Sequence, residues 1–170
     1  IAATCAAWTP LSVWYDDEGR ALRFELFPLA SQLVLVEPRI LVAAPADFLR
    51  AGIGDTLAKW YEARVLCERE PSLPLTAQLG LSVARQIHDV LLAEGPAALA
   101  AVSKNTIDAH FLQVVDAIIA GGGLVGGLGE RFTRLAAAHS VHNGLTVLPE
   151  TAQFLHGAKV AYGILVQLAL

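Results

Sequence analysis

The sequence predicts an α/β remnant followed by an all-α region, with the change near residue 45. Short β-branched and aromatic runs with strand-like alternation occur in residues 1–44, whereas from Pro45 onward apolar residues recur at three- and four-residue spacing. The chain also begins at Ile1, without a Met, and stops at Leu170 inside an apolar helical pattern with no Gly or Pro stop. We therefore expect the end of one domain, a larger helical domain over residues 45–170, and truncation at both ends.

Three extended segments are predicted in the first part. Leu11–Tyr15 is a β-branched and aromatic run that stops at the acidic turn sequence 16–19. The segment 21–27 alternates polar and apolar residues, and the segment 31–36 is a short apolar run closed by Glu37-Pro38. Together they look like the edge of an α/β sheet.

The helical part contains seven predicted helices separated by Gly and Pro. These are residues 46–51, 55–70, 76–92, 96–102, 105–120, 130–144 and 158–170. The glycine-rich run Gly121–Gly129 lacks the Lys-Ser/Thr of a phosphate-binding loop and follows a helix instead of a strand. We therefore predict a flexible helix–helix junction there.

Composition excludes two classes of partner. A net charge of −4 leaves no basic footprint for nucleic acid. The apolar run Ala117–Leu128 is too short and too glycine-rich to span a bilayer, and charged residues follow at once. Cys5 and Cys67 lie too far apart for a CxxC pair or a disulfide framework. We expect a soluble, cytoplasmic protein.

Three short segments carry residues that could perform chemistry. Asp55 follows two glycines at the predicted start of a helix, where an N-cap is the favoured interpretation of this residue taken alone. His139 and His142 are three residues apart and share a helix face, and His156 precedes a glycine. Isolated histidines usually belong to the core, but these three fall within one short Ala/Gly-rich region. One carboxylate and two imidazoles with an open position suit a catalytic zinc or ferrous ion.

The segments Gly52–Arg64, His139–Thr146 and His156–Gly163 resemble those of glycerol dehydrogenases. These belong to the iron-containing alcohol dehydrogenase superfamily, whose two-domain fold resembles dehydroquinate synthase. The resemblance runs from Ile1 to Leu170. It implies that residues 1–44 end an N-terminal dinucleotide-binding α/β domain and that residues 45–170 form the helical metal-binding domain.

The same resemblance assigns site residues. Asp55, His139 and His156 match the metal ligands, which act catalytically through the metal; zinc is expected, with iron or nickel as alternatives. The first fifteen residues look like the last segment that contacts the cofactor, NAD or NADP. The positions that match the lining of its nicotinamide half are Ala3, Thr9, Leu11 and Tyr15.

Two further residues bear on the substrate. Glycerol dehydrogenases usually carry an Asp that touches the polyol where this chain has Cys5. The segment from Cys5 to Pro10 and the Gly121–Gly129 run are closer to hydroxycarboxylate dehydrogenases, so we expect a 2-hydroxy acid/2-oxo acid pair. His142 lies one turn beyond a ligand, and we expect it beside the metal ligands or on the substrate side.

The predicted function is metal-dependent hydride transfer between a nicotinamide cofactor and a small alcohol or carbonyl substrate. A glycerol or polyol dehydrogenase is one alternative. A lyase of the dehydroquinate synthase type is another, although it needs a basic cleft and Lys/Arg residues are sparse near these motifs. A non-catalytic helical fragment is the third. We also expect a homo-oligomer, with a small-molecule substrate as the partner.

Overall fold

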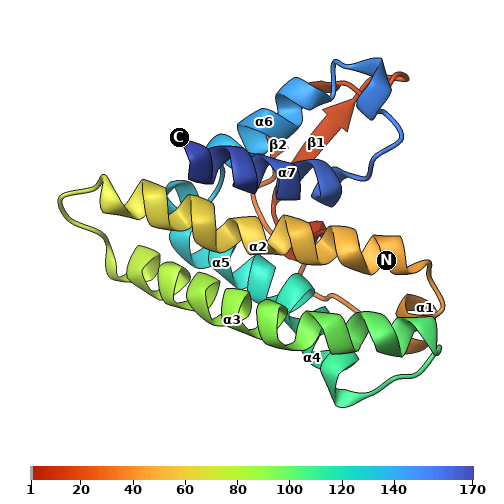
Figure 1. Cartoon of the computed structure of the whole chain (residues 1–170). Coiled ribbons are helices and arrows are strands. Elements are labelled where there is room, and N and C mark those ends of the chain that lie inside the picture. The colour runs from red at the N-terminus through yellow and green to blue at the C-terminus, as the bar shows by residue number, and fades with distance from the viewer. Residues whose placement is uncertain (1) are drawn as a thin grey trace.

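The computed structural model describes residues 2–170, so Ile1, the first residue of the predicted cofactor segment, lies outside the described residues. The protein is mostly helical, with one small sheet near the N-terminus (Figure 1). The predicted order, a short β-containing part followed by helices, is confirmed at this level.

The small sheet is an antiparallel hairpin of β1 (Leu11–Tyr15) and β2 (Ala21–Leu26). Its turn forms where the acidic sequence predicts it, because the Asp16 carboxylate accepts hydrogen bonds from two backbone N–H groups. The donors are Glu18 at 3.1 Å and Arg20 at 2.7 Å. Local side-chain chemistry therefore fixes this turn.

The third predicted strand is wrong. Residues 31–36 form neither strand nor helix, and Leu33 and Leu35 are 81% and 89% exposed. A strand needs a neighbour to pair its backbone N–H and C=O groups. Within residues 2–170 the only sheet is the two-stranded hairpin, so this apolar segment has no ladder to join.

Two long helices, α2 (Ala46–Glu68) and α3 (Leu75–Ser103), run side by side through the molecule (Figure 1). Against α3 pack α4 (Ala109–Asp116) and α5 (Gly122–Gly129), while α6 (Ala137–Leu145) and α7 (His156–Ala169) pack together on the side of α2. The shorter elements are η1 (Cys5–Trp8), α1 (Pro38–Val42), the π-helical η2 (Ala117–Gly121), η3 (Glu130–Phe132) and η4 (Pro149–Thr151).

Two apolar clusters hold these helices together. The larger lies among α2, α3, α4 and α5 and contains the fully buried Phe111, Leu91 and Ile118. The smaller joins α2 to the α6–α7 pair and includes Ala58 and Val160. Burial of the smaller cluster therefore fixes the face of α2 on which the histidine-bearing helices lie.

Three predicted helix breaks are absent, at residues 52–54 within α2, at Gly95-Pro96 and at Gly121–Gly129. Helix α3 passes through Gly95-Pro96, where two helices were predicted. Proline removes one N–H and leaves the carbonyl of residue i−4 without its partner. That residue is Leu92, which is 56% exposed and so lies on a solvent-facing side of α3.

The predicted flexible junction at Gly121–Gly129 is also wrong, because helix runs through this stretch as η2 and α5. The glycines allow close approach to neighbouring elements. A Cβ on Gly122 would lie 2.5 Å from the Cβ of Cys5.

The helical stretch Ala109–Phe132 is longer than the apolar run seen in the sequence. By length and composition alone it could cross a membrane, but half of its most apolar window is buried inside the protein. Its residues Phe111, Val114, Ile118 and Val125 belong to the larger apolar cluster. This is the pattern of a core helix.

Candidate metal and substrate site

Asp55 lies within α2, so the N-cap interpretation of this residue is wrong. Its side chain is almost fully buried, with the residue 1% exposed. One carboxylate oxygen, Oδ2, accepts a hydrogen bond of 3.2 Å from the backbone N–H of Cys5 in η1. The other, Oδ1, faces His139 and His156.

Glycines bring α7 close enough to α2 for His156 to reach Asp55. A Cβ on Gly54 would lie 2.7 Å from the backbone oxygen of Gly157, and a Cβ on Gly157 would lie 1.8 Å from the backbone oxygen of Ala51. Each of these glycines directly adjoins one of the two site residues. Gly54 and Gly157 thus allow α2 and α7 to pack closely. The sequence had instead suggested that the glycines before Asp55 form a tight turn.

The three side chains predicted as metal ligands lie together, because His139 and His156 both point toward Asp55 Oδ1. The Nε2 atom of His156 is 3.0 Å away and the Nε2 atom of His139 is 3.4 Å away. One ligand atom from each of the three residues lies within 4.8 Å of the others. Two ligands bonded at about 2.0–2.1 Å in tetrahedral directions lie roughly 3.3 Å apart, so these separations fit a shared metal ion.

Glu62 orients His139 and was missed by the sequence analysis. Its fully buried carboxylate accepts hydrogen bonds from His139 Nδ1 at 2.6 Å, from His139 N at 2.9 Å and from Ala136 N at 2.8 Å. Because Nδ1–H donates to Glu62, the neutral ring presents the Nε2 lone pair toward Asp55. This carboxylate–histidine arrangement is typical of metal sites.

A second relay orients His156. His142 lies between Asn143 Oδ1, 3.0 Å from its Nδ1, and His156 Nδ1, 2.9 Å from its Nε2. If His142 donates from Nδ1, it accepts the Nδ1–H of His156, and the Nε2 lone pair of His156 then faces Asp55. His142 therefore contacts a candidate ligand without reaching Asp55 itself.

The pKa values of these groups follow from burial and from each other. Burial raises the pKa of Asp55, but hydrogen bonds with His139 and His156 lower it by more, so the net position is well below the usual range. Burial lowers the pKa of His139, while contacts with Asp55 and Glu62 raise it above normal. For His142, burial and the neighbouring His156 charge lower the pKa to about 4. His142 is thus neutral near pH 7.

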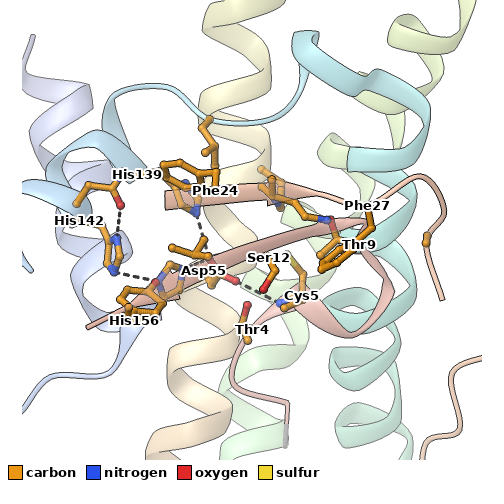
Figure 2. Close-up of a pocket in the computed structure, with 18 of the residues that line it drawn as sticks. Thr4, Cys5, Thr9, Ser12, Phe24, Phe27, Asp55, His139, His142 and His156 are labelled. Carbon is orange, nitrogen blue, oxygen red and sulfur yellow. Dashed lines mark hydrogen bonds and ion pairs between the residues drawn. The ribbon is translucent and has the colours of Figure 1, made fainter. Parts of the chain in front are cut away.

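An open pocket of about 720 Å³ lies beside this cluster. Figure 2 shows its side chains, with Asp55 joined by dashed lines to His156 and to Cys5. Of the predicted cofactor and substrate residues, those that line the pocket are Thr9, Leu11, Tyr15, Cys5 and His142. Ala3 is not among the lining residues.

Lys59 is the second residue that sequence reasoning missed. It lies one turn after Asp55 and lines the same pocket. Burial lowers its pKa, but the nearby Cys5, Asp55 and Glu62 raise it by more, so Lys59 remains a cation. Positions four and seven after Asp55 share its helix face, and this spacing could have identified both Lys59 and Glu62.

Comparisons with known proteins give a consistent result. The chain is 64% identical over 170 residues to hydroxycarboxylate dehydrogenase A of Escherichia coli K12, with all of this chain and 47% of that protein covered. It is 43% identical to glycerol dehydrogenase of Pseudomonas putida over 174 residues, again covering the whole chain and 46% of the relative. No family model matches the sequence.

Among solved structures, a glycerol dehydrogenase from Schizosaccharomyces pombe superposes with a TM-score of 0.88 at 32% identity, over 99% of this chain and 43% of that one. A probable glycerol dehydrogenase from Sinorhizobium meliloti 1021 gives the same TM-score at 33% identity, over 96% and 46%. The chain spans about half the length of the curated relatives it matches. The resemblance predicted from the sequence is confirmed: over its whole length the chain is similar to glycerol dehydrogenases and to a hydroxycarboxylate dehydrogenase.

Proposed function

We propose that this chain is part of a metal-dependent oxidoreductase that transfers a hydride between NAD or NADP and a small alcohol or carbonyl compound. The observation that carries the proposal is the meeting of Asp55, His139 and His156 at the wall of an open pocket. The names of the relatives support the reaction class, since they are dehydrogenases of hydroxycarboxylates and of glycerol.

Asp55 Oδ1 and the Nε2 atoms of His139 and His156 would hold a divalent metal ion. Mixed nitrogen and oxygen ligands with space beside them suit zinc, with iron or nickel as alternatives. When bound, the ion would polarise the substrate oxygen and favour its alkoxide form. His156 is the most accessible of the three, with 31% of its side chain exposed, so substrate would approach from its side of the pocket.

Other residues of the chain hold the three ligand side chains in their orientations. The Cys5 backbone N–H and the Glu62 carboxylate fix the orientations of Asp55 and His139, and His142 does so for His156. Preorganised ligands need no rearrangement when substrate arrives, which lowers the barrier.

The cofactor would approach from the β1–β2 side of the pocket. Thr9, Leu11 and Tyr15 lie there and would contact the nicotinamide half. We further propose that residues 1–44 end a dinucleotide-binding domain and that residues 45–170 are the helical domain of a dehydroquinate synthase-like fold. The change from the β1–β2 hairpin to a run of helices along the chain supports this division.

For the substrate we propose a 2-hydroxy acid/2-oxo acid pair. Burial raises the pKa of the Cys5 thiol to about 11, so this position adds no negative charge to the pocket. A carboxylate there would repel an acidic substrate; two like charges about 4 Å apart interact by roughly 4 kcal/mol at an effective dielectric of 20. The 64% identity to a hydroxycarboxylate dehydrogenase supports the same choice.

A polyol dehydrogenase is the second candidate, because a relative at 43% identity is a glycerol dehydrogenase. The lyase alternative lacks support here. Among the described residues, Lys59 is the only Lys or Arg that lines the pocket, whereas binding a phosphorylated substrate calls for several cations.

The test uses the full-length enzyme and its His139→Ala and His156→Ala variants. Each variant should lose stoichiometric metal and nicotinamide-dependent turnover while keeping its far-UV circular dichroism. His110→Ala is the matched control, since His110 is exposed and pairs with Glu94 away from the pocket. Metal retained at full occupancy in both site variants would overturn the proposed site.

A further inference from the structure

Lys59 is a pocket residue that the proposed metal chemistry does not use. It follows Asp55 by one helical turn, and side chains at this spacing lie about 5–6 Å apart at Cβ. Within the described part of the chain, no salt bridge occupies its ammonium group, although ten ion pairs form elsewhere. Its side chain contacts the neutral Cys5 thiol, so the cation has no carboxylate partner of its own and can take one from a ligand in the pocket.

The charges that line the pocket bear on which substrates it favours. Asp55 and Lys59 are the two lining residues, among those described, whose side chains are ordinarily ionised at neutral pH. They cancel, so a divalent ion at Asp55 would leave the lining with an excess of positive charge. Glu62 offsets part of this excess from behind His139. A substrate that carries one negative charge would balance more of it than a neutral one.

We propose that Lys59 binds the carboxylate of the 2-hydroxy acid or 2-oxo acid and so determines that the enzyme prefers acids to uncharged polyols. This inference rests on the proposed function. In these substrates the carboxylate is bonded directly to the reacting carbon. If the reacting oxygen of such a molecule lies at the Asp55–His139–His156 cluster, its carboxylate lies close to that cluster. Lys59, one helical turn after Asp55, is then near enough to bind it.

The lysine side chain suits this role. Its ammonium is a compact point charge with three donors on a flexible stem, so it can follow carboxylates of somewhat different substrates. It also lies beside the Cys5 thiol, which contributes no competing carboxylate. An alternative role is purely structural, in which Lys59 balances the charges of Asp55 and Glu62 within the protein.

The experiment compares two substrates with one carbon skeleton on the full-length, metal-loaded enzyme. These are 2-oxobutanoate and 1-hydroxybutan-2-one, in which a CH2OH group replaces the carboxylate. Lys59→Met should lower kcat/KM for 2-oxobutanoate by about 10–100-fold, mainly through KM, and change the uncharged ketone by less than about threefold. Lys59→Arg should recover most of the loss. Lys104→Met, at an exposed position after α3, is the control.

A binding measurement separates this inference from the proposed function. Calorimetric titration with oxamate, an unreactive 2-oxo acid analogue, should show about 10–100-fold weaker binding to Lys59→Met at unchanged metal content. Equal losses on both substrates, no loss on either, or loss of metal would overturn the carboxylate role. If the wild-type enzyme reduces neither substrate, the proposed function fails; Lys59-dependent oxamate binding would then still support the carboxylate site.

Discussion

Replacing Glu62 with Gln tests how the protein prepares His139 for a metal ion. Gln keeps the shape of Glu and can still accept hydrogen bonds from the backbone N–H groups of Ala136 and His139 through its carbonyl oxygen. Its NH2 group then faces His139 Nδ1, which is 2.6 Å from the present carboxylate oxygen. Two donors cannot share that contact, so the ring must move its proton to Nε2 or rotate.

Either response removes the Nε2 lone pair from the cluster. Loss of a supporting carboxylate of this kind costs about 10–100-fold in metal affinity. The exchange of a buried charge-assisted hydrogen bond for a poorer contact should also lower the unfolding free energy of the metal-free protein by about 1–3 kcal/mol. For a domain of 150–250 residues this corresponds to a Tm lower by roughly 2–12 °C.

The assay is equilibrium dialysis against buffered zinc, with 15N NMR to read the His139 tautomer. Glu94→Gln is a matched control because Glu94 contacts His110 at the surface in the same carboxylate–imidazole manner. Wild-type zinc affinity in Glu62→Gln, with the Nδ1-protonated tautomer retained, would refute the orienting role.

Three further changes probe the site from other directions. Gly157→Ala should lower the unfolding free energy by more than about 2 kcal/mol, since its Cβ would lie 1.8 Å from the Ala51 backbone oxygen, while Gly144→Ala, with open space around it, should not; denaturant titration compares them. Cys5→Asp should shift kcat/KM from 2-oxo acids toward uncharged diols, and an unchanged ratio would leave Cys5 as a packing residue. The His142 pKa lies near 4 when folded and near 6.5 when unfolded, so its contribution to stability is present above pH 6.5 and is lost as pH falls toward 4. Metal-free His142→Ala should lack that part of the pH dependence, and an unaltered profile would contradict it.

The sequence predicted the residues of the candidate site better than it predicted the helices that carry them and how those helices pack. Asp55, His139 and His156 could be named because their residue types suit a metal ion and because the resemblance to glycerol dehydrogenases assigns them as ligands. The start of α2 was misplaced because Gly52 and Gly54 read as a turn, although their function is contact with other elements. Such contacts depend on which helix packs against which, and no local pattern encodes that.

The same reason explains the missed residues. Glu62 and Lys59 look like ordinary charged positions on a long amphipathic helix, which are usually exposed to solvent. They become site residues only because the small apolar cluster of Ala58, Ala138 and Val160 docks α6 and α7 on their side of α2. The strand predicted at residues 31–36 is the opposite kind of error, a predicted element that does not form. The run has the local pattern of a strand but lacks a pairing strand among residues 2–170.

The arrangement around Asp55 separates the chemistry of the site from its choice of substrate. Cys5 supports Asp55 through its backbone N–H, a group that every residue except proline possesses, so the side chain at position 5 can change while the hydrogen bond remains. Lys59 adjoins the same carboxylate along α2 without bonding to it. The charge at positions 5 and 59 can therefore vary while the Asp55–His139–His156 cluster is preserved. If the proposed site is right, changes at positions 5 and 59 would alter whether an acid or a polyol is favoured while the metal ligands stay the same.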